Sequence, residues 1–352
     1  MSSALVLIVV VLAQAGLLAA LIAVIVTIRW RGRRRTRRIA PLREASDRAM
    51  ADWTTADGDI AVVEAALAAL PPIVAVDVLV TWSSRAPGDH WHRLAERLTA
   101  SPWANGIRGY ARSRWWWRRL DAARFLSTVA TTADGPAISA LLDDEHPAVR
   151  LAAVTAVAHL PSPVLLRAAL APVPTLTAAG VAYHAGVLRP ARAALVPILL
   201  ERLQLAEPGL ARFAEFSARL GDPALRAPLT ALASHPDFEV RIQIARALGA
   251  YPHVESSVAL SALATDPVWQ VRAQALRSLG RLGDASALGL LRAGLADPEW
   301  WVRLHSGLAL TRLGPAGLDA LSATEQSGPG PALDMARLIL GASPQARAEF
   351  AT

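Results

Sequence analysis

The side chains that could support catalysis or bind a metal ion are few, and their spacing does not favour either role. The chain has no cysteine, so thiolate nucleophiles, thiolate metal sites and disulfides are excluded. His90 and His92 are two residues apart, whereas neighbours on one helix face are three or four residues apart. The adjacent acids Asp143, Asp144 and Glu145 lie at a predicted turn, where helix capping explains them. We therefore expect no catalytic residue, no metal site, no cofactor and no small-molecule substrate.

The segment 108–119, with the sequence RGYARSRWWWRR, is the remaining candidate for binding chemistry. It holds five arginines, one tyrosine and three tryptophans, and it has no acidic residue. Such a composition could bind phosphate or carboxylate groups of a nucleic acid, a lipid or an acidic partner, or lie on a membrane surface. Alternatively, the tryptophans open a helix and pack against the helices before it. The register of Arg119 with the repeats described next favours packing.

Two stretches of sequence are near-copies of one another at a distance of 31 residues. They read LATDPVWQVRAQALRSLGRLGD over 263–284 and LADPEWWVRLHSGLALTRLGP over 295–315. A fixed period of this size is typical of stacked helical repeats. Asp266 and Asp297 are expected to cap a helix whose first residue is Pro267 or Pro298. A second helix over 285–295 completes each unit as a helical hairpin.

The same register extends backwards through the chain and predicts its organisation. We expect an all-α fold, a right-handed α-solenoid of about seven 31-residue helix pairs over residues 115–341, with a tail over 342–352. Arg150 and Arg241 are 91 residues apart, two short of three periods, so two divergent repeats lie between them. Residues 41–114 are expected to form irregular helical pairs before the array.

The pattern D-P-x-x-x-V-R-x-x-A-x-x-x-L-G-x-L-G-D resembles the bacterial HEAT-like repeat, of the type also named for phycobilisome lyases. The resemblance covers about residues 115–340 and implies a ladder of arginine and aspartate side chains along the solenoid. The matching arginines are Arg119, Arg150, Arg241, Arg272 and Arg303, and the matching acids are Asp143 or Asp144, Asp237, Asp266 and Asp297. Such repeats occur in lyases, hydroxylases and plain scaffolds, so the resemblance does not specify an activity.

Aromatic residues recur at the same 31-residue spacing. Phe238, Trp269 and Trp300 are equivalent in successive repeats, Trp116 has the corresponding position in an earlier repeat, and Trp301 follows Trp300. Equivalent positions stack into a row, which could be a recognition surface for a partner protein. Alternatively, each ring covers the seam between neighbouring helices.

The N-terminus predicts a membrane anchor. Residues 4–28 carry no charge, and a helix of this length spans the roughly 30 Å hydrocarbon core of a bilayer. A basic linker over 29–40 follows the anchor, which is assigned to residues 1–28. The positive-inside rule then predicts a single-pass inner-membrane protein with its N-terminus outside and the repeats in the cytoplasm. The linker arginines are expected to contact anionic lipid head groups: Arg29, Arg31, Arg33, Arg34, Arg35, Arg37 and Arg38.

The charge of the chain argues against nucleic acid as the main partner. All 36 basic residues are arginine, and without the seven in the linker the remaining 29 equal the 29 acidic residues. We expect a membrane-anchored cytoplasmic scaffold that binds a membrane-associated protein and is not an enzyme. A resemblance to proteins of envelope-polysaccharide loci suggests a glycosyltransferase as that partner. The alternatives are a nucleic-acid-binding HEAT-like protein that uses segment 108–119, and a lyase-like HEAT enzyme.

Overall fold

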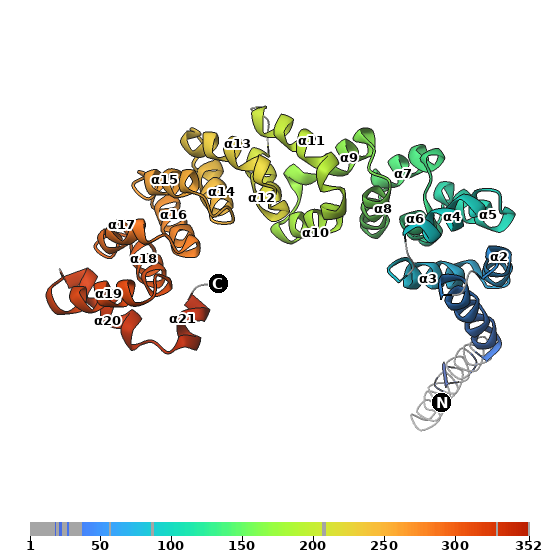
Figure 1. Cartoon of the computed structure of the whole chain (residues 1–352), viewed down its shortest axis with the longest axis horizontal. Coiled ribbons are helices and arrows are strands. Elements are labelled where there is room, and N and C mark those ends of the chain that lie inside the picture. The colour runs from blue at the N-terminus through green and yellow to red at the C-terminus, as the bar shows by residue number, and fades with distance from the viewer. Residues whose placement is uncertain are drawn as a thin grey trace, which may run out of the picture. The chain divides into compact units, whose positions relative to one another are not determined.

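The computed structural model describes residues 18, 21, 22, 27, 37–55, 58–85, 88–205, 209–328 and 330–350. Within these ranges the chain is a succession of helices without a strand (Figure 1). The predicted all-α class is therefore confirmed. Contacts divide the chain into two compact units, residues 1–156 and 157–352. The segment boundaries predicted from the repeat register stay predictions.

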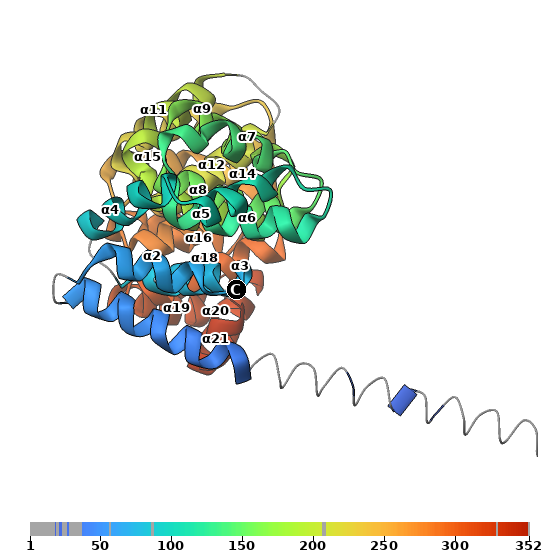
Figure 2. The ribbon, with the colours of Figure 1, turned by 90° about the vertical axis from the view of Figure 1, so that its right-hand side faces the viewer.

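The first unit begins with a run of helices of unequal length. A helix over 37–55 lies along α2 and α3 (Figure 2), where the Ser46 hydroxyl donates to the Ala66 carbonyl at 3.0 Å and the Trp82 indole donates to Asp47 at 2.9 Å. The core of this unit forms where α3 and α6 pack, around the fully buried Phe125. The helices of this unit are α2 (Ile60–Ala68), α3 (Pro72–Ser83), α4 (Gly88–Thr99), α5 (Pro102–Gly109), η1 (Tyr110–Arg112), α6 (Trp116–Val129), η2 (Thr132–Asp134), α7 (Gly135–Leu142) and most of α8 (Pro147–His159).

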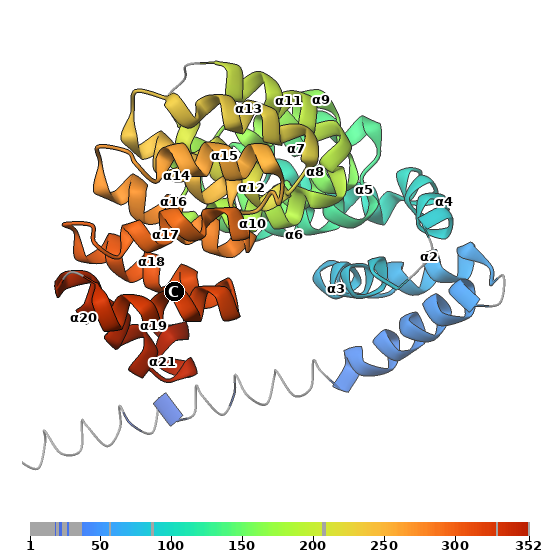
Figure 3. The ribbon, with the colours of Figure 1, turned by 60° about the vertical axis from the view of Figure 1, so that its left-hand side comes forward.

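The second unit is built from two layers of helices. The helices α10, α12, α14, α16 and α18 pack side by side in chain order, and α11, α13, α15 and α17 form the other layer (Figure 3). The elements of this unit are α9 (Pro163–Leu170), η3 (Val173–Thr175), α10 (Ala178–Leu188), η4 (Arg189–Ala191), α11 (Arg192–Gln204), α12 (Leu210–Leu220), η5 (Pro223–Leu225), α13 (Arg226–Ala231), η6 (Leu232–Ser234), α14 (Phe238–Leu248), α15 (Val254–Leu263), α16 (Trp269–Leu282), η7 (Ala285–Ala287), α17 (Leu288–Gly294), α18 (Trp300–Arg312), α19 (Pro315–Ser327), α20 (Gly330–Gly341) and α21 (Pro344–Phe350). Over the described chain, α6 to α19 follow one another as seven helix pairs.

Packing of small residues sets the close approach of the stacked helices. A Cβ on Gly280 of α16 would lie 2.5 Å from the Ala309 Cβ of α18, so the two helices touch there. Gly249 and Ser278 make the same contact one repeat earlier, at 2.9 Å from the added Cβ to the Ser278 Cβ. The apolar residues of α16 face the core, with Val271 and Leu279 fully buried. The 31-residue period is therefore a packing period.

Two of the predicted helix starts are wrong by two residues. Helices α16 and α18 begin at Trp269 and Trp300, with Val268 and Glu299 as their N-caps. Asp266 lies two residues before Val268, the N-cap of α16, and its carboxylate accepts the Val268 N–H at 2.8 Å. Asp266 stays in the turn before the helix because its carboxylate also pairs with Arg241 of the preceding repeat.

The predicted localisation is corrected by the structure. A membrane span needs about 20 successive apolar residues in one helix, and none of the helices in the described ranges is both long enough and apolar enough for that. This finding overturns the prediction of a single-pass inner-membrane protein with cytoplasmic repeats. Of the predicted anchor, only Leu18, Leu21, Ile22 and Thr27 are described, and of the basic linker only residues 37–40. The remaining predicted lipid-contacting arginines, from Arg29 to Arg35, lie outside the described residues.

Candidate partner-binding surface

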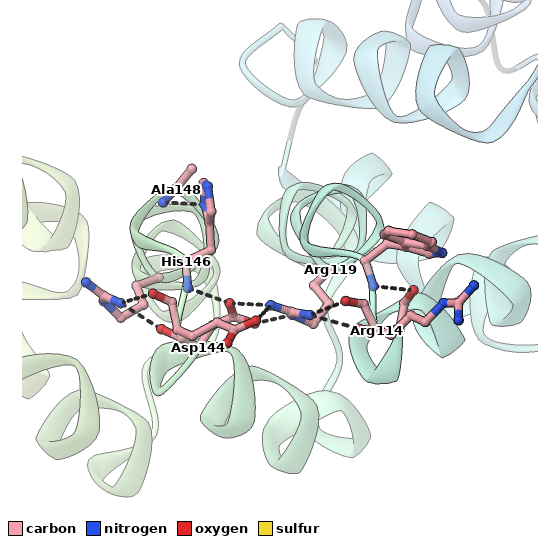
Figure 4. Close-up of polar contacts among 9 residues, drawn as sticks. Arg114, Arg119, Asp144, His146 and Ala148 are labelled. Atoms are coloured by element: carbon pink, nitrogen blue, oxygen red, sulfur yellow. Dashed lines mark hydrogen bonds and ion pairs between the residues drawn. The ribbon is translucent and has the colours of Figure 1, made fainter.

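An arginine–aspartate pair joins successive repeats in the first unit (Figure 4). Arg119 binds both carboxylate oxygens of Asp144, with Nε at 2.5 Å and Nη2 at 3.0 Å. Its Nη1 donates to the carbonyls of Ser113 and Arg114 at 3.0 and 3.2 Å, which belong to the turn before its own helix. Asp144 in turn accepts the N–H of His146 at 2.9 Å. One guanidinium therefore fastens its own helix start to the next repeat.

The same arrangement occurs twice in the second unit. Arg241 binds Asp266 at 2.7 and 3.0 Å, and Arg272 binds Asp297 at 2.8 and 2.9 Å. Arg272 also donates to the carbonyl of Asp266 at 2.8 Å, so consecutive pairs are linked through one residue. Burial raises the pKa of the Asp266 carboxyl, but the hydrogen bonds from Arg241 and from the Val268 N–H outweigh burial and hold that pKa below its usual value. These side chains are mostly buried and act as braces between repeats.

Three predicted ladder members have other contacts. Arg150 and Arg303 donate through Nη1 to two carbonyls of their own turns, at 2.7 to 3.0 Å. The position 25 residues further on, which holds the paired aspartate elsewhere, is Thr175 after Arg150 and Gly328 after Arg303. Asp237 caps α14 by accepting the Glu239 N–H at 2.9 Å.

The predicted aromatic residues occupy one helical position. Trp116, Phe238, Trp269 and Trp300 are each the first residue of their helix, because each follows an extended N-cap residue. All are exposed except Trp269, which is half-buried. In the first unit the Trp116 ring stacks on His146, with centroids 3.9 Å apart, so this ring covers the seam between α6 and α8.

Trp301 differs from the others because it points along its own helix. Its ring is exposed, meets the Trp300 ring edge-on at 4.8 Å, and lies 6.3 Å from the His305 ring one turn later. Half of the surface of Trp301 is exposed.

Segment 108–119 is anchored to the fold by two of its arginines, whereas its three tryptophans and its other three arginines are exposed. Arg108 pairs with Asp134 at 2.9 Å, and Arg119 belongs to the ladder. The guanidinium of Arg118 lies 5.2 Å from the centre of the Tyr110 ring, and that of Arg114 lies 4.6 Å from the Trp115 ring. Two of the five arginines are therefore neutralised by carboxylates within the fold.

An apolar groove that the sequence did not predict lies in the second unit. It has a volume of about 830 Å³ and runs between α15 and the segment formed by α13 and η6. Val254 and Val258 of α15 line it, with 69% and 66% of their surface exposed. Its lining includes two turns, His235–Pro236 and Asp266–Pro267, and each turn is one residue away from the aromatic residue that begins α14 or α16. The available signal was that the apolar residues of α15 are not confined to one face, since Val254 and Val258 lie outside the face that is buried.

Comparisons with known proteins support the repeat architecture. Residues 256–329 match the family described as HEAT repeats. No curated protein matches the chain. The predicted HEAT-like repeats are thus confirmed for residues 256–329. The comparisons do not support the expected bacterial origin of the repeat type.

Solved structures with similar helical arrangements include human deoxyhypusine hydroxylase in complex with glycerol. It is 19% identical, with a TM-score of 0.29, and the similarity covers 76% of this chain and 96% of the hydroxylase. An engineered protein is 18% identical with a TM-score of 0.33, covering 87% and 98% of the two chains. The Pds5–Scc1 complex contains a chain that is 10% identical with a TM-score of 0.32, covering 79% and 63%. Similarities at this level carry no argument about what this chain binds.

Proposed function

We propose that this protein is a non-enzymatic scaffold that binds a segment of a partner protein in the groove along α15. The observation that carries the proposal is the exposure of Val254 and Val258 in a groove of about 830 Å³. Exposed apolar surface in a concave site is typical of protein-binding regions. Covering each valine would contribute roughly 1.5 kcal/mol to binding. The HEAT repeats matched over 256–329 begin within α15 and support the same role.

The aromatic row is proposed to extend this surface. Phe238 and Trp269 begin the helices that follow the two turns at the end of the groove, so a bound segment longer than the groove would meet them. Large aromatic side chains contribute strongly to protein interfaces because they bury much area with few rotatable bonds. The ladder acids are proposed to have no chemical role, since arginines already bind Asp144, Asp266 and Asp297. The predicted membrane-associated partner depended on the corrected localisation and is not part of this proposal.

The test is affinity capture of partners from native cell extract with the full chain and two variants. The groove variant carries Val254→Glu and Val258→Glu, and the control carries Val164→Glu on α9, a valine of matched exposure (72%) outside the groove. We expect proteins captured by the wild type to be retained by the control and lost with the groove variant. Capture of the same proteins by all three chains would contradict the proposal. Circular dichroism of each variant establishes that the fold is intact.

A further inference from the structure

One ladder arginine is held like its paired counterparts but has no acid to bind. Arg303 of α18 donates through Nη1 to the carbonyls of Asp297 and Pro298, at 2.8 Å each. Arg272 makes the equivalent two contacts one repeat earlier, and its Nε and Nη2 bind the Asp297 carboxylate. Because the same backbone contacts hold both guanidinium groups, the Nε and Nη2 edge of Arg303 faces the equivalent place in the next repeat.

This edge of Arg303 is unsatisfied. Its Nε is buried and has no hydrogen-bond partner within the described part of the chain. No ion pair joins Arg303 to an acid of the described residues, whereas Arg119, Arg241 and Arg272 each form one. A buried donor without an acceptor is costly, and more so when it carries charge. A ligand that accepts from this nitrogen would therefore be stabilised on binding.

The chain does not supply the missing carboxylate at the expected position. The residue 25 positions after Arg303 is Gly328, the C-cap of α19. A Cβ on Gly328 would lie 2.5 Å from the Thr324 carbonyl oxygen, so a side chain there would require the end of α19 to move. Glu325 of the same helix pairs with Arg337 of α20 at 3.5 Å. An acid for Arg303 would therefore have to come from another molecule.

A hollow beside Gly328 leaves room for such an acid. It has a volume of about 280 Å³, and its lining includes Arg292 of α17 and Gly328 itself. Arg292 is exposed and forms no ion pair within the described ranges. The hollow is smaller than the roughly 300–1,000 Å³ of typical small-molecule sites and therefore suits a single side chain.

The repeat register places Arg303 next to this hollow. Gly328 is 62 residues, or two periods, after Asp266, which lines the groove along α15. Arg303 is likewise 62 residues after Arg241, which lines the same groove and binds Asp266 there. The hollow is thus the counterpart of the groove two repeats later, with the aspartate replaced by glycine.

We propose that Arg303 is an open position of the ladder that binds an aspartate or glutamate side chain of the partner protein. A guanidinium binds a carboxylate through two parallel N–H groups. A carboxylate is favoured over a phosphate because the equivalent edge binds a carboxylate in Arg119, Arg241 and Arg272. Arg292 adds a second positive charge at the hollow. This inference rests on the proposed scaffold function and specifies a second contact with the partner, outside the groove along α15.

The experiment follows the Nε–H resonance of Arg303 by NMR in the full chain with isotope-labelled arginine. The Arg303→Lys variant assigns the resonance, because lysine keeps the charge and lacks the fork. We expect acetyl-aspartyl-amide to shift this resonance saturably, with a dissociation constant on the order of 10 mM. Acetyl-asparaginyl-amide, which has no charge, should leave it in place. The Nε–H resonances of Arg241 and Arg272, whose forks are occupied, are matched internal controls and should not move.

A second variant tests where the carboxylate lies. Arg292→Gln should raise the dissociation constant of acetyl-aspartyl-amide about threefold, because it removes an exposed charge at the hollow and leaves Arg303 intact. Equal binding by this variant and the wild type would show that the carboxylate does not enter the hollow, and would overturn the inference.

Three further results would also overturn it. They are no shift of the Arg303 resonance, equal shifts of the Arg241 and Arg272 resonances, and tighter binding of inorganic phosphate than of acetyl-aspartyl-amide. The last result would make Arg303 part of a phosphate site. The groove variant with Val254→Glu and Val258→Glu keeps Arg303 and should show the normal shift. Absence of the shift while groove-dependent capture persists would remove this inference and leave the scaffold function standing.

Discussion

At the scale of single residues, the ladder arginines have two separate tasks. One half of each guanidinium holds the turn before its own helix, and in Arg119, Arg241 and Arg272 the other half binds the next repeat. Arg303 only holds the turn before its own helix. It has no aspartate to bind in the next repeat, because the residue 25 positions further on is Gly328. The chain therefore contains a natural comparison between the two tasks.

We predict that Arg272→Gln lowers the free energy of unfolding by about 3 kcal/mol, because it leaves the largely buried Asp297 carboxylate without its partner. Arg303→Gln should cost about 1 kcal/mol, since it removes only hydrogen bonds to backbone carbonyls. Chemical denaturation followed by circular dichroism measures both changes. Equal losses for the two variants would show that the carboxylate pairing adds no stability.

At the scale of helices, glycine sets the distance between neighbours in the stacked layer. Gly280 of α16 has the Ala309 Cβ and Cα within 2.6 Å of where its own Cβ would be, whereas Gly289 of α17 has nothing within 4 Å. Both glycines lie in helices, so both substitutions to alanine gain the same helix propensity. Only the alanine at position 280 would also push a neighbouring helix, α18, away.

We predict that Gly280→Ala destabilises the protein by about 2 kcal/mol, because overpacking outweighs the gain in helix propensity. Gly289→Ala should be neutral or stabilise by up to about 1 kcal/mol. Thermal unfolding of the two variants gives the comparison. If both raised the melting temperature, α16 and α18 would not be in close contact.

At the scale of the whole molecule, charge is divided between the linker and the rest of the chain. Seven arginines lie within 29–38, and the other 29 are balanced by 29 acids. Non-specific attraction to a polyanion depends on the number of cations that contact phosphate. The linker should therefore account for most DNA binding by the full chain, whatever the repeats bind.

We predict that changing all seven linker arginines to glutamine weakens single-stranded DNA binding at least about tenfold and flattens its dependence on salt. A comparison variant with Arg246→Gln on α14 and Arg281→Gln on α16 should keep most of the DNA affinity. Fluorescence anisotropy at several salt concentrations measures both. The opposite ranking of the two variants would assign DNA binding to the repeats.

The sequence by itself determined the helical hairpins and their register. Caps, helix-ending glycines and apolar stripes act within a few residues, and repetition at 31 residues makes equivalent positions adjacent. The expected second helix over 285–295 corresponds to η7 and α17, and the repeat region from 256 to 329 is matched as HEAT repeats. The pairing of Arg272 with Asp297 is what the resemblance to HEAT-like repeats implied.

Only the tertiary structure decided which equivalent residues meet. Asp144 and not Asp143 binds Arg119, while Asp237 caps its own helix. Arg212 lies 25 residues before Asp237, the spacing of the other ladder pairs, but it pairs with Glu215. The groove along α15 depends on the spacing and rotation of neighbouring helices. Because that geometry arises from side-chain packing between repeats, a pattern confined to one repeat does not contain it.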